Sequence, residues 1–306
     1  MRDSKRSLLQ AIARIFDPFG FLASFTIKAK IIFQLAWEQG VRCDDPLPDE
    51  IAVEWSRWIN AVPGILKISV PRALMPEEST SVLFVHCFCD ASIRAYGTVV
   101  HLRTESNIAV EMVPAKSRIA PLKRVTLPRL ELLGALLGAR LTTYVVRALH
   151  MEEEVTCFWS DSSIVLHWIK GSASRWKPFV ENRVTEIQTL CDPSRWRFCP
   201  GHENPADLTT RGVQPERLII DEFSWRGPKW LSSSDETWPV LEQRAPEPST
   251  EAVEGEMKGV LQCLAAAEAV APQMFHIRDF NTLVTVLRLT ACIKRFAVNC
   301  RSTEAK

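Results

Sequence analysis

Two short apolar runs that each end in an aspartate constrain the fold of this chain more than any other feature. Residues 82–89 precede Asp90, and residues 155–160 precede Asp161. A nearly continuous apolar run of this length is typical of a strand that is covered on both faces. The sequence therefore predicts an α/β fold in which helices flank a central sheet. Three further strands are predicted at residues 96–103, 108–117 and 195–199.

Helical periodicity fills most of the chain around these strands. Ser4 is a suitable N-cap for the first helix, and Pro128 suits the first turn of a long helix that ends near Leu149. Further helices are predicted at about 22–38, 49–60, 164–168, 176–190, 255–271 and 278–298. The patterns divide the chain into a helical segment at 1–72, an α/β domain at 80–225, a linker at 226–256 and a helical segment at 257–306.

Composition excludes several classes of protein. The net charge of +1 means that any contact with nucleic acid must come from local basic patches. No apolar run reaches 18 residues and the start lacks a secretory signal, so we expect neither a membrane span nor secretion. The nine cysteines include no Cys-x-x-Cys pair, which predicts reduced, mostly buried thiols and no zinc site. We therefore expect a protein of the cytoplasm or nucleus.

The candidate catalytic residues are four acids on four different elements: Asp90, Glu131, Asp161 and Asp207. On a helix, the small residues at 134, 135 and 138 share the face of Glu131, so this helix can lie close to a sheet. Glu131 would then approach the aspartates at the ends of the two apolar runs. Carboxylates brought so close repel one another, and a pair of Mg²⁺ ions would relieve that repulsion.

The settings of these acids resemble the four acidic motifs of the ribonuclease H fold, in the variant found in BEL/Pao-type LTR retrotransposon polyproteins. The motifs are Phe88–Ser92, the Glu131 helix, Trp159–Ser163 and Asn204–Asp207. Flanking segments at 4–6, 16–20, 176–184 and 283–299 also resemble that family. The resemblance implies a ribonuclease H-like mixed five-stranded sheet with flanking helices. A reverse-transcriptase connection segment would precede it, and a linker and helices that lead toward an integrase region would follow.

The resemblance also implies a role for each acid. Asp90 would bridge two Mg²⁺ ions, for which Mn²⁺ is a possible substitute. Glu131 and Asp161 would hold the ion nearer the leaving group, and Asp207 would complete the site of the water-activating ion. His202, in the loop before Asp207, would help product release. The implied substrate is the RNA strand of an RNA–DNA hybrid, and the implied partners are the reverse transcriptase and integrase parts of the parent polyprotein.

Basic residues near the predicted site are candidates for binding nucleic acid through phosphate contacts and stacking. The candidates are Arg118, Lys123, Arg124, Arg175, Trp176, Lys177 and Arg183. An ordinary solvated surface explains any one of them equally well.

Two other functions stay open from the sequence. The chain could be a non-catalytic connection module that binds nucleic acid without cutting it. It could also be an aspartic peptidase, since the family region is also called the Pao retrotransposon peptidase. Such an enzyme needs two aspartates that share a proton. Asp161 is followed by Ser162 and Ser163 where a Gly is expected in the third position, and no second such loop is found.

Overall fold

The computed structural model describes residues 3–71, 83–105, 108–151, 156–234, 238–239, 253–258 and 291. Met1–Lys258 form one compact unit. The helices predicted at about 255–271 and 278–298 lie almost entirely outside the described residues. Where the first of them is described, residues 255–257 form a turn and a bridge to Trp176 instead of a helix.

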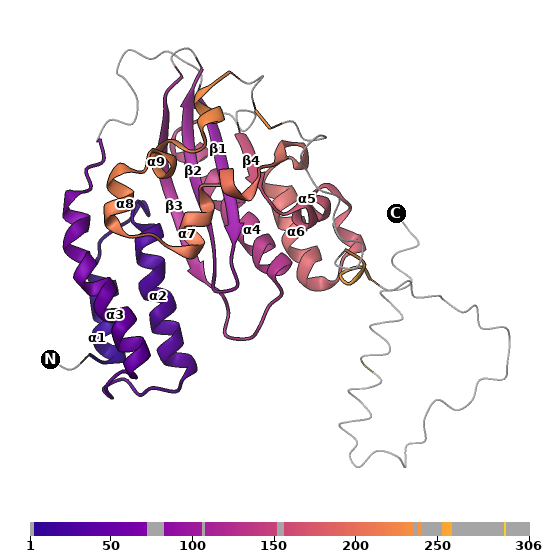
Figure 1. The fold of residues 1–306 in the computed structure, drawn as a ribbon. Helices are drawn as coiled ribbons and strands as arrows, with labels where there is room; N and C mark the ends of the chain where they lie inside the picture. The colour runs from indigo at the N-terminus through magenta and orange to yellow at the C-terminus, as the bar shows by residue number, and fades with distance from the viewer. Residues whose placement is uncertain are drawn as a thin grey trace, which may run out of the picture. The chain divides into compact units, whose positions relative to one another are not determined.

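A mixed five-stranded sheet in the order β3-β2-β1-β4-β5 forms the centre of the first unit (Figure 1). The strands are β1 (Leu83–Ala91), β2 (Ala95–Thr104), β3 (Val110–Ile119), β4 (Thr156–Ser160) and β5 (Trp196–Phe198). β1, β2 and β3 form an antiparallel meander, whereas β4 pairs in parallel with both β1 and β5. This confirms the fold class expected from the sequence.

Alternate residues of β1 supply two separate cores, as the pleat of a strand requires. Cys87 and Cys89 belong to the core beneath three helices, α4 (Leu127–Ala148), α5 (Ser163–Lys170) and α6 (Pro178–Leu190). Phe88 packs in the opposite core with Trp159. The chain after β5 covers that second face with α7 (Ala206–Arg211), α9 (Glu222–Arg226) and η6 (Lys229–Ser232), whereas α8 (Pro215–Ile220) packs with the N-terminal helices (Figure 1). Burial on both faces explains why β1 and β4 are continuous apolar runs.

The N-terminal helices pack against the edge of this sheet. They are α1 (Lys5–Arg14), α2 (Ala23–Glu38), α3 (Asp49–Ala61) and the short η1 (Val62–Lys67). Ser4 caps α1 as predicted, and Trp55 and Trp58 stack in the helical core with ring centroids 5.2 Å apart. The amide of Gln34 on α2 donates to the carbonyl oxygen of Ala120 after β3, at 2.6 Å. The sequence placed a domain boundary between residues 72 and 80. In the structure, the residues before and after it belong to one compact unit, so this boundary remains a prediction.

Residues 226–234, which the sequence assigned to the linker, lie against the sheet instead. Leu231 is fully buried in the core of the second face. The Arg103 guanidinium of β2 donates to the carbonyl oxygens of Leu231 and Ser233, each at 3.0 Å. Composition cannot show such contacts, because they depend on a strand more than a hundred residues earlier in the chain. None of the helices in the described ranges is long and apolar enough to cross a bilayer.

Candidate active site

Asp90 and Asp161 lie side by side at one edge of the sheet. β1 and β4 are parallel, and Cys89 is paired with Ser160, so the residue that follows each of them is an aspartate at the same height. Asp90 is only 6% exposed. The apolar strands that made these two acids conspicuous in the sequence therefore also bring them together.

Glu131 reaches this edge from α4. A Cβ atom at Gly134 would stand 2.9 Å from the carbonyl oxygen of Asp90, so only glycine permits this closeness of helix and strand. The hydroxyl of Ser162 donates a short hydrogen bond to Glu131. The same Ser162 oxygen accepts from the amide of Val165 and so caps α5. Ser162 thereby connects the Glu131 helix, α4, to the segment between β4 and α5.

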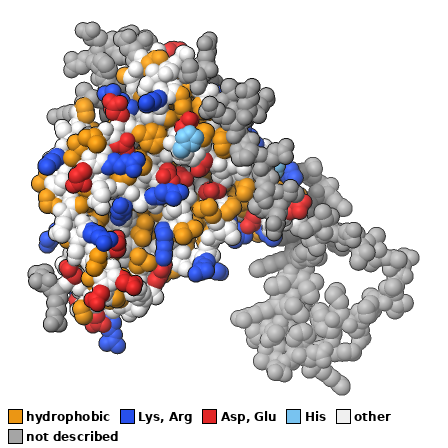
Figure 2. Space-filling model, viewed as in Figure 1, with side chains coloured by type: hydrophobic (Ala, Val, Ile, Leu, Met, Phe, Trp, Pro, Cys, Tyr) orange, Lys and Arg blue, Asp and Glu red, His pale blue; other side chains and the backbone are white. Residues whose placement is uncertain are grey.

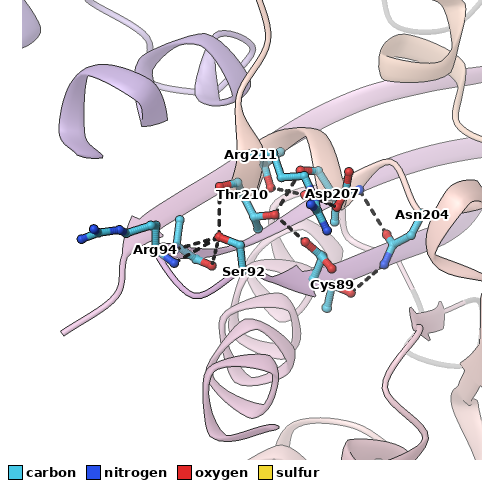
Figure 3. Close-up of polar contacts among 11 residues, drawn as sticks. Cys89, Ser92, Arg94, Asn204, Asp207, Thr210 and Arg211 are labelled. Carbon is cyan, nitrogen blue, oxygen red and sulfur yellow. Dashed lines mark hydrogen bonds and ion pairs between the residues drawn. The ribbon is translucent and has the colours of Figure 1, made fainter. Parts of the chain in front are cut away.

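The fourth acid, Asp207, lies in the first turn of α7, and the loop before it fastens that helix to β1. The Asn204 side chain is fully buried, and its amide donates to the carbonyl oxygen of Cys89 at 2.9 Å (Figure 3). Thr210 donates to the Asp90 carboxylate, and Arg211 forms an ion pair with Asp207 (Figure 3). The segment from Asn204 to Arg211 therefore places an acid, a hydroxyl and a cation at the end of β1.

Sequence reasoning missed the partners of the acids: Ser162, Thr210 and Arg211. The spacing of Thr210 and Arg211, three and four residues after Asp207, places all three on one face of a helix. The spacing was visible in the sequence, but the strand that these residues would face was not. Ser162 was noted only within the motif around Asp161.

The carboxyl groups of Asp90, Glu131 and Asp161 all have raised pKa values, mainly because they are buried and partly because of neighbouring acids. Burial raises the pKa of Asp161 to about 7, and the charges of Asp90, Glu131 and Asp207 add to the effect. Burial also raises the pKa of Asp90; the Thr210 hydrogen bond opposes this rise, and the charge of Asp207 reinforces it. The pKa of Glu131 is raised by burial and by Asp90 and is lowered by the bond from Ser162. Ionising Asp90, Glu131 and Asp161 together is therefore costly without a cation.

The donor set fits a hard divalent cation. Mg²⁺ prefers oxygen ligands, and Asp161 Oδ1 is buried with no hydrogen-bond partner among the described residues. The other three acids are held by Ser162, Thr210 and Arg211. In the part of the chain that the structure describes, no three His, Cys, Asp or Glu side chains are already arranged to hold a metal ion. Cation binding would therefore require these carboxylates to exchange their present partners.

His202 lies beside the acids but outside their buried cluster. It belongs to η5 (Gly201–Glu203), and its side chain is 80% exposed, with Nε2 3.5 Å from Glu203. The preceding Gly201 is close to the site, since a Cβ atom there would stand 3.0 Å from Asp161 Oδ2. An exposed imidazole at this position is compatible with the predicted part in product release, which stays a prediction.

The residues predicted to contact nucleic acid form two groups, and the prediction for one of them was wrong. Trp176 is fully buried in the core beneath α4, α5 and α6, so it offers no face to a base. Around it, Lys177 donates to the Gly255 carbonyl oxygen at 2.6 Å, and the Arg183 guanidinium lies 3.6 Å from the centroid of the Phe179 ring. Arg175 is exposed above Trp176.

The second group, Arg118, Lys123 and Arg124, is exposed on β3 and on the loop that follows it. On the face that carries α7 and α8, Figure 2 shows Lys and Arg side chains scattered among Asp and Glu side chains, without one dominant basic patch. This pattern agrees with the net charge of +1.

Comparison with known proteins identifies a family. The model described as "Pao retrotransposon-like RNaseH-like domain" matches residues 4–162, which is just over half of the chain. Among solved structures, the chain is similar to the N-terminal RNase H domain of a Mycobacterium tuberculosis protein, at 18% identity and a TM-score of 0.33, covering 42% of this chain and 91% of that one. RNase H1 from the archaeon Halobacterium salinarum is similar at 14% identity and a TM-score of 0.30, covering 40% and 89%. A search of curated proteins finds no match.

Proposed function

The chain belongs to the Pao retrotransposon-like RNaseH-like domain family, and on that premise we propose that it hydrolyses the RNA strand of an RNA–DNA hybrid. The observation that supports this proposal best is the convergence of four carboxylates, on β1, α4, the end of β4 and α7, with the pKa of Asp161 raised to about 7. Perturbed acids of this kind concentrate at functional sites.

In the proposed mechanism, Asp90, Glu131, Asp161 and Asp207 would hold two divalent ions, Mg²⁺ or Mn²⁺. Asp90 would serve both ions, Glu131 and Asp161 would serve the one nearer the leaving group, and Asp207 would serve the other. When bound, such ions supply an activated water and stabilise the leaving oxygen of a phosphodiester. The pKa of Asp161 is raised to about 7, so this side chain would have to be ionised to serve as a ligand. Recognition of the 2′-hydroxyl would distinguish RNA from DNA.

The protein's own side chains prepare this site. Ser162 and Thr210 orient Glu131 and Asp90 through hydroxyl donors, which can turn away when an oxygen is needed as a ligand. Arg211 forms an ion pair with Asp207 and would have to release it for Asp207 to hold a cation. His202, whose side chain is exposed, would assist departure of the product.

The test compares Asp90→Asn with the native protein on a labelled RNA–DNA hybrid, in Mg²⁺, in Mn²⁺ and in EDTA. We expect metal-dependent cleavage of the RNA strand, reduced at least a hundredfold by Asp90→Asn, a loss on the order of that seen when one charge-stabilising group is removed from other active sites. Asp45→Asn, on the exposed surface, is the matched control and keeps the activity. Folded native protein that leaves the hybrid uncut in both metals would contradict the proposal.

One observation favours a second candidate, a module that binds nucleic acid without cutting it. The Arg211 guanidinium already neutralises Asp207, which is where a cation would otherwise be needed. Hybrid binding that is unaffected by divalent ions, together with no cleavage, would support this candidate. No comparable observation favours an aspartic peptidase. Ser162, next to Asp161, caps α5 and donates a hydrogen bond to Glu131. Pepstatin-sensitive self-cleavage would be needed to support it.

We also propose the wider setting that the family implies. Residues 1–72 would connect this domain to a reverse transcriptase, and the chain beyond residues 226–234, which lie against the sheet, would lead toward an integrase. The parent polyprotein would act inside the cell, in the cytoplasm or the nucleus.

A further inference from the structure

A groove of about 630 Å³ lies outside the acidic site, between the α1–α2 connection and α4. β3, the edge strand of the sheet, forms its floor. The connection is fastened to that strand, since the amide of Ala115 donates to the Phe19 carbonyl oxygen at 2.9 Å. The groove is therefore built from parts that the sequence assigned to two separate segments.

The charged side chains that line this groove are mostly cations: Lys30, Lys116, Arg118 and Arg140, against one acid, Asp17. Asp17 is engaged in accepting from the amide of Leu22 at 2.8 Å, and Arg140 is paired with Glu186. Within the described ranges, Lys116 and Arg118 form no ion pair, and both are exposed. A ligand with repeated negative charges complements such a lining.

Two aromatic rings also line the groove. Phe19 is 57% exposed and Tyr144 is 72% exposed, although apolar surface of this size is usually buried. Exposed rings next to a track of cations are the combination that binds single strands, because cations contact the phosphates and bases stack on the rings. Bases inside a duplex are already stacked on one another and cannot use these rings.

From this combination we propose that the groove binds a single-stranded stretch of nucleic acid. Strand register relates the groove to the acids. Arg118 is paired with Tyr96, and Tyr96 is paired with Ala91, the residue after Asp90. Two strand spacings amount to about 10 Å. The second half of the inference rests on the proposed function: the stretch is an unpaired extension of the hybrid whose RNA strand lies at the acids.

The test measures binding in EDTA, so that cleavage plays no part, by fluorescence anisotropy of a labelled oligonucleotide. The probes are a blunt RNA–DNA hybrid, the same hybrid with a single-stranded extension, and a free single strand. We expect the extension to tighten binding about tenfold, the size of one stacked base on one ring. Tyr144→Ala should remove most of that gain, whereas Tyr144→Phe, which keeps the ring, should retain it.

The cations are tested separately with the double variant Lys116→Ala/Arg118→Ala. Two lost phosphate contacts should reduce the slope of log K against log salt by about 1.4 for the single strand. Arg42→Ala/Lys67→Ala removes two exposed cations away from the groove and serves as the matched control.

Three results would overturn the inference. The blunt and extended hybrids could bind equally, the Tyr144→Ala variant could keep the gain, or the groove could prove to be an interface between two copies of the chain. The last result would appear in sedimentation as a dimer that Lys116→Ala/Arg118→Ala dissociates. Failure of the proposed function is distinct from all three, since it appears as absent cleavage in Mg²⁺ and leaves binding in EDTA unchanged.

Discussion

Replacing Asp161 by asparagine should stabilise the protein at alkaline pH, although it removes a residue of the proposed catalytic site. The carboxyl pKa rises from an ordinary 3.8 to about 7, mainly through burial. Each unit of pKa corresponds to about 1.4 kcal/mol. The rise from 3.8 to about 7 therefore means that the ionised carboxylate destabilises the folded protein by up to about 4 kcal/mol. The site is partly reached by water and the neighbouring acids titrate together, which reduces the expected net effect to about 2 kcal/mol.

The pH dependence follows from where the proton binds. Between pH 4 and pH 7 the unfolded chain has already lost the Asp161 proton while the folded protein still holds it, so stability falls as the pH rises. Above about pH 7 both states are ionised and the penalty is complete. The Asp161→Asn variant lacks this penalty. Its advantage over the native protein should therefore grow from pH 4 to pH 7 and then stay constant.

Thermal unfolding in EDTA, followed by circular dichroism from pH 4 to pH 8, measures this advantage. At 2–4 °C per kcal/mol for a domain of this size, we expect the Tm of Asp161→Asn to exceed that of the native protein by roughly 4–8 °C at pH 8. Asp45→Asn, on the surface, should show no such pH-dependent gain. Mg²⁺ should raise the native Tm more at pH 8 than at pH 5, because cations bind the ionised carboxylates.

Equal Tm values for Asp161→Asn and the native protein at pH 8 would refute the reasoning. They would show that the folded protein does not penalise the ionised Asp161, and that burial at this edge of the sheet leaves its pKa near the ordinary value.

Two other predictions concern stability and are measured by urea denaturation. Gly20→Ala should lower the free energy of unfolding by about 1–3 kcal/mol more than Gly40→Ala does. Both glycines have positive φ, but a Cβ at Gly20 would overlap the Ala115 carbonyl, whereas nothing lies within 4 Å of a Cβ at Gly40. Equal losses would mean that the connection can move away from β3. Asn204→Ala should cost about 1–3 kcal/mol, because it leaves buried backbone groups without partners, while the exposed Asn60→Ala should be nearly neutral. An equally small loss for Asn204→Ala would show that water replaces its hydrogen bonds.

Much of the fold could be predicted from the sequence because the signals are local. Each of the five strands begins and ends within three residues of its predicted bounds, and the Ser4 cap was recognised from its own turn. The four acids could also be singled out, because a charged group that ends an apolar strand is conspicuous in one dimension. Gly134 even indicated how closely α4 could approach the sheet.

Burial and long-range contacts of individual residues could not be predicted in the same way. Trp176 looked like a stacking residue beside its basic neighbours, yet α6 and the core around it bury the indole completely. The boundary of the linker was misplaced because Leu231 is held by Arg103 from a distant strand. In each case the deciding contacts depend on how the helices and strands pack together, and composition carries no record of them.

The sequence by itself therefore determined which elements form and that each of four elements carries an acid, since hydrophobic periodicity and capping act over a few residues. Only the tertiary structure decided that Ser162, Thr210 and Arg211 hold those acids, that burial raises the pKa of Asp161, and that α4 and the α1–α2 connection enclose a basic groove. Burial and electrostatic interaction depend on everything that surrounds a group in space, and a chain acquires those surroundings only when distant segments pack together.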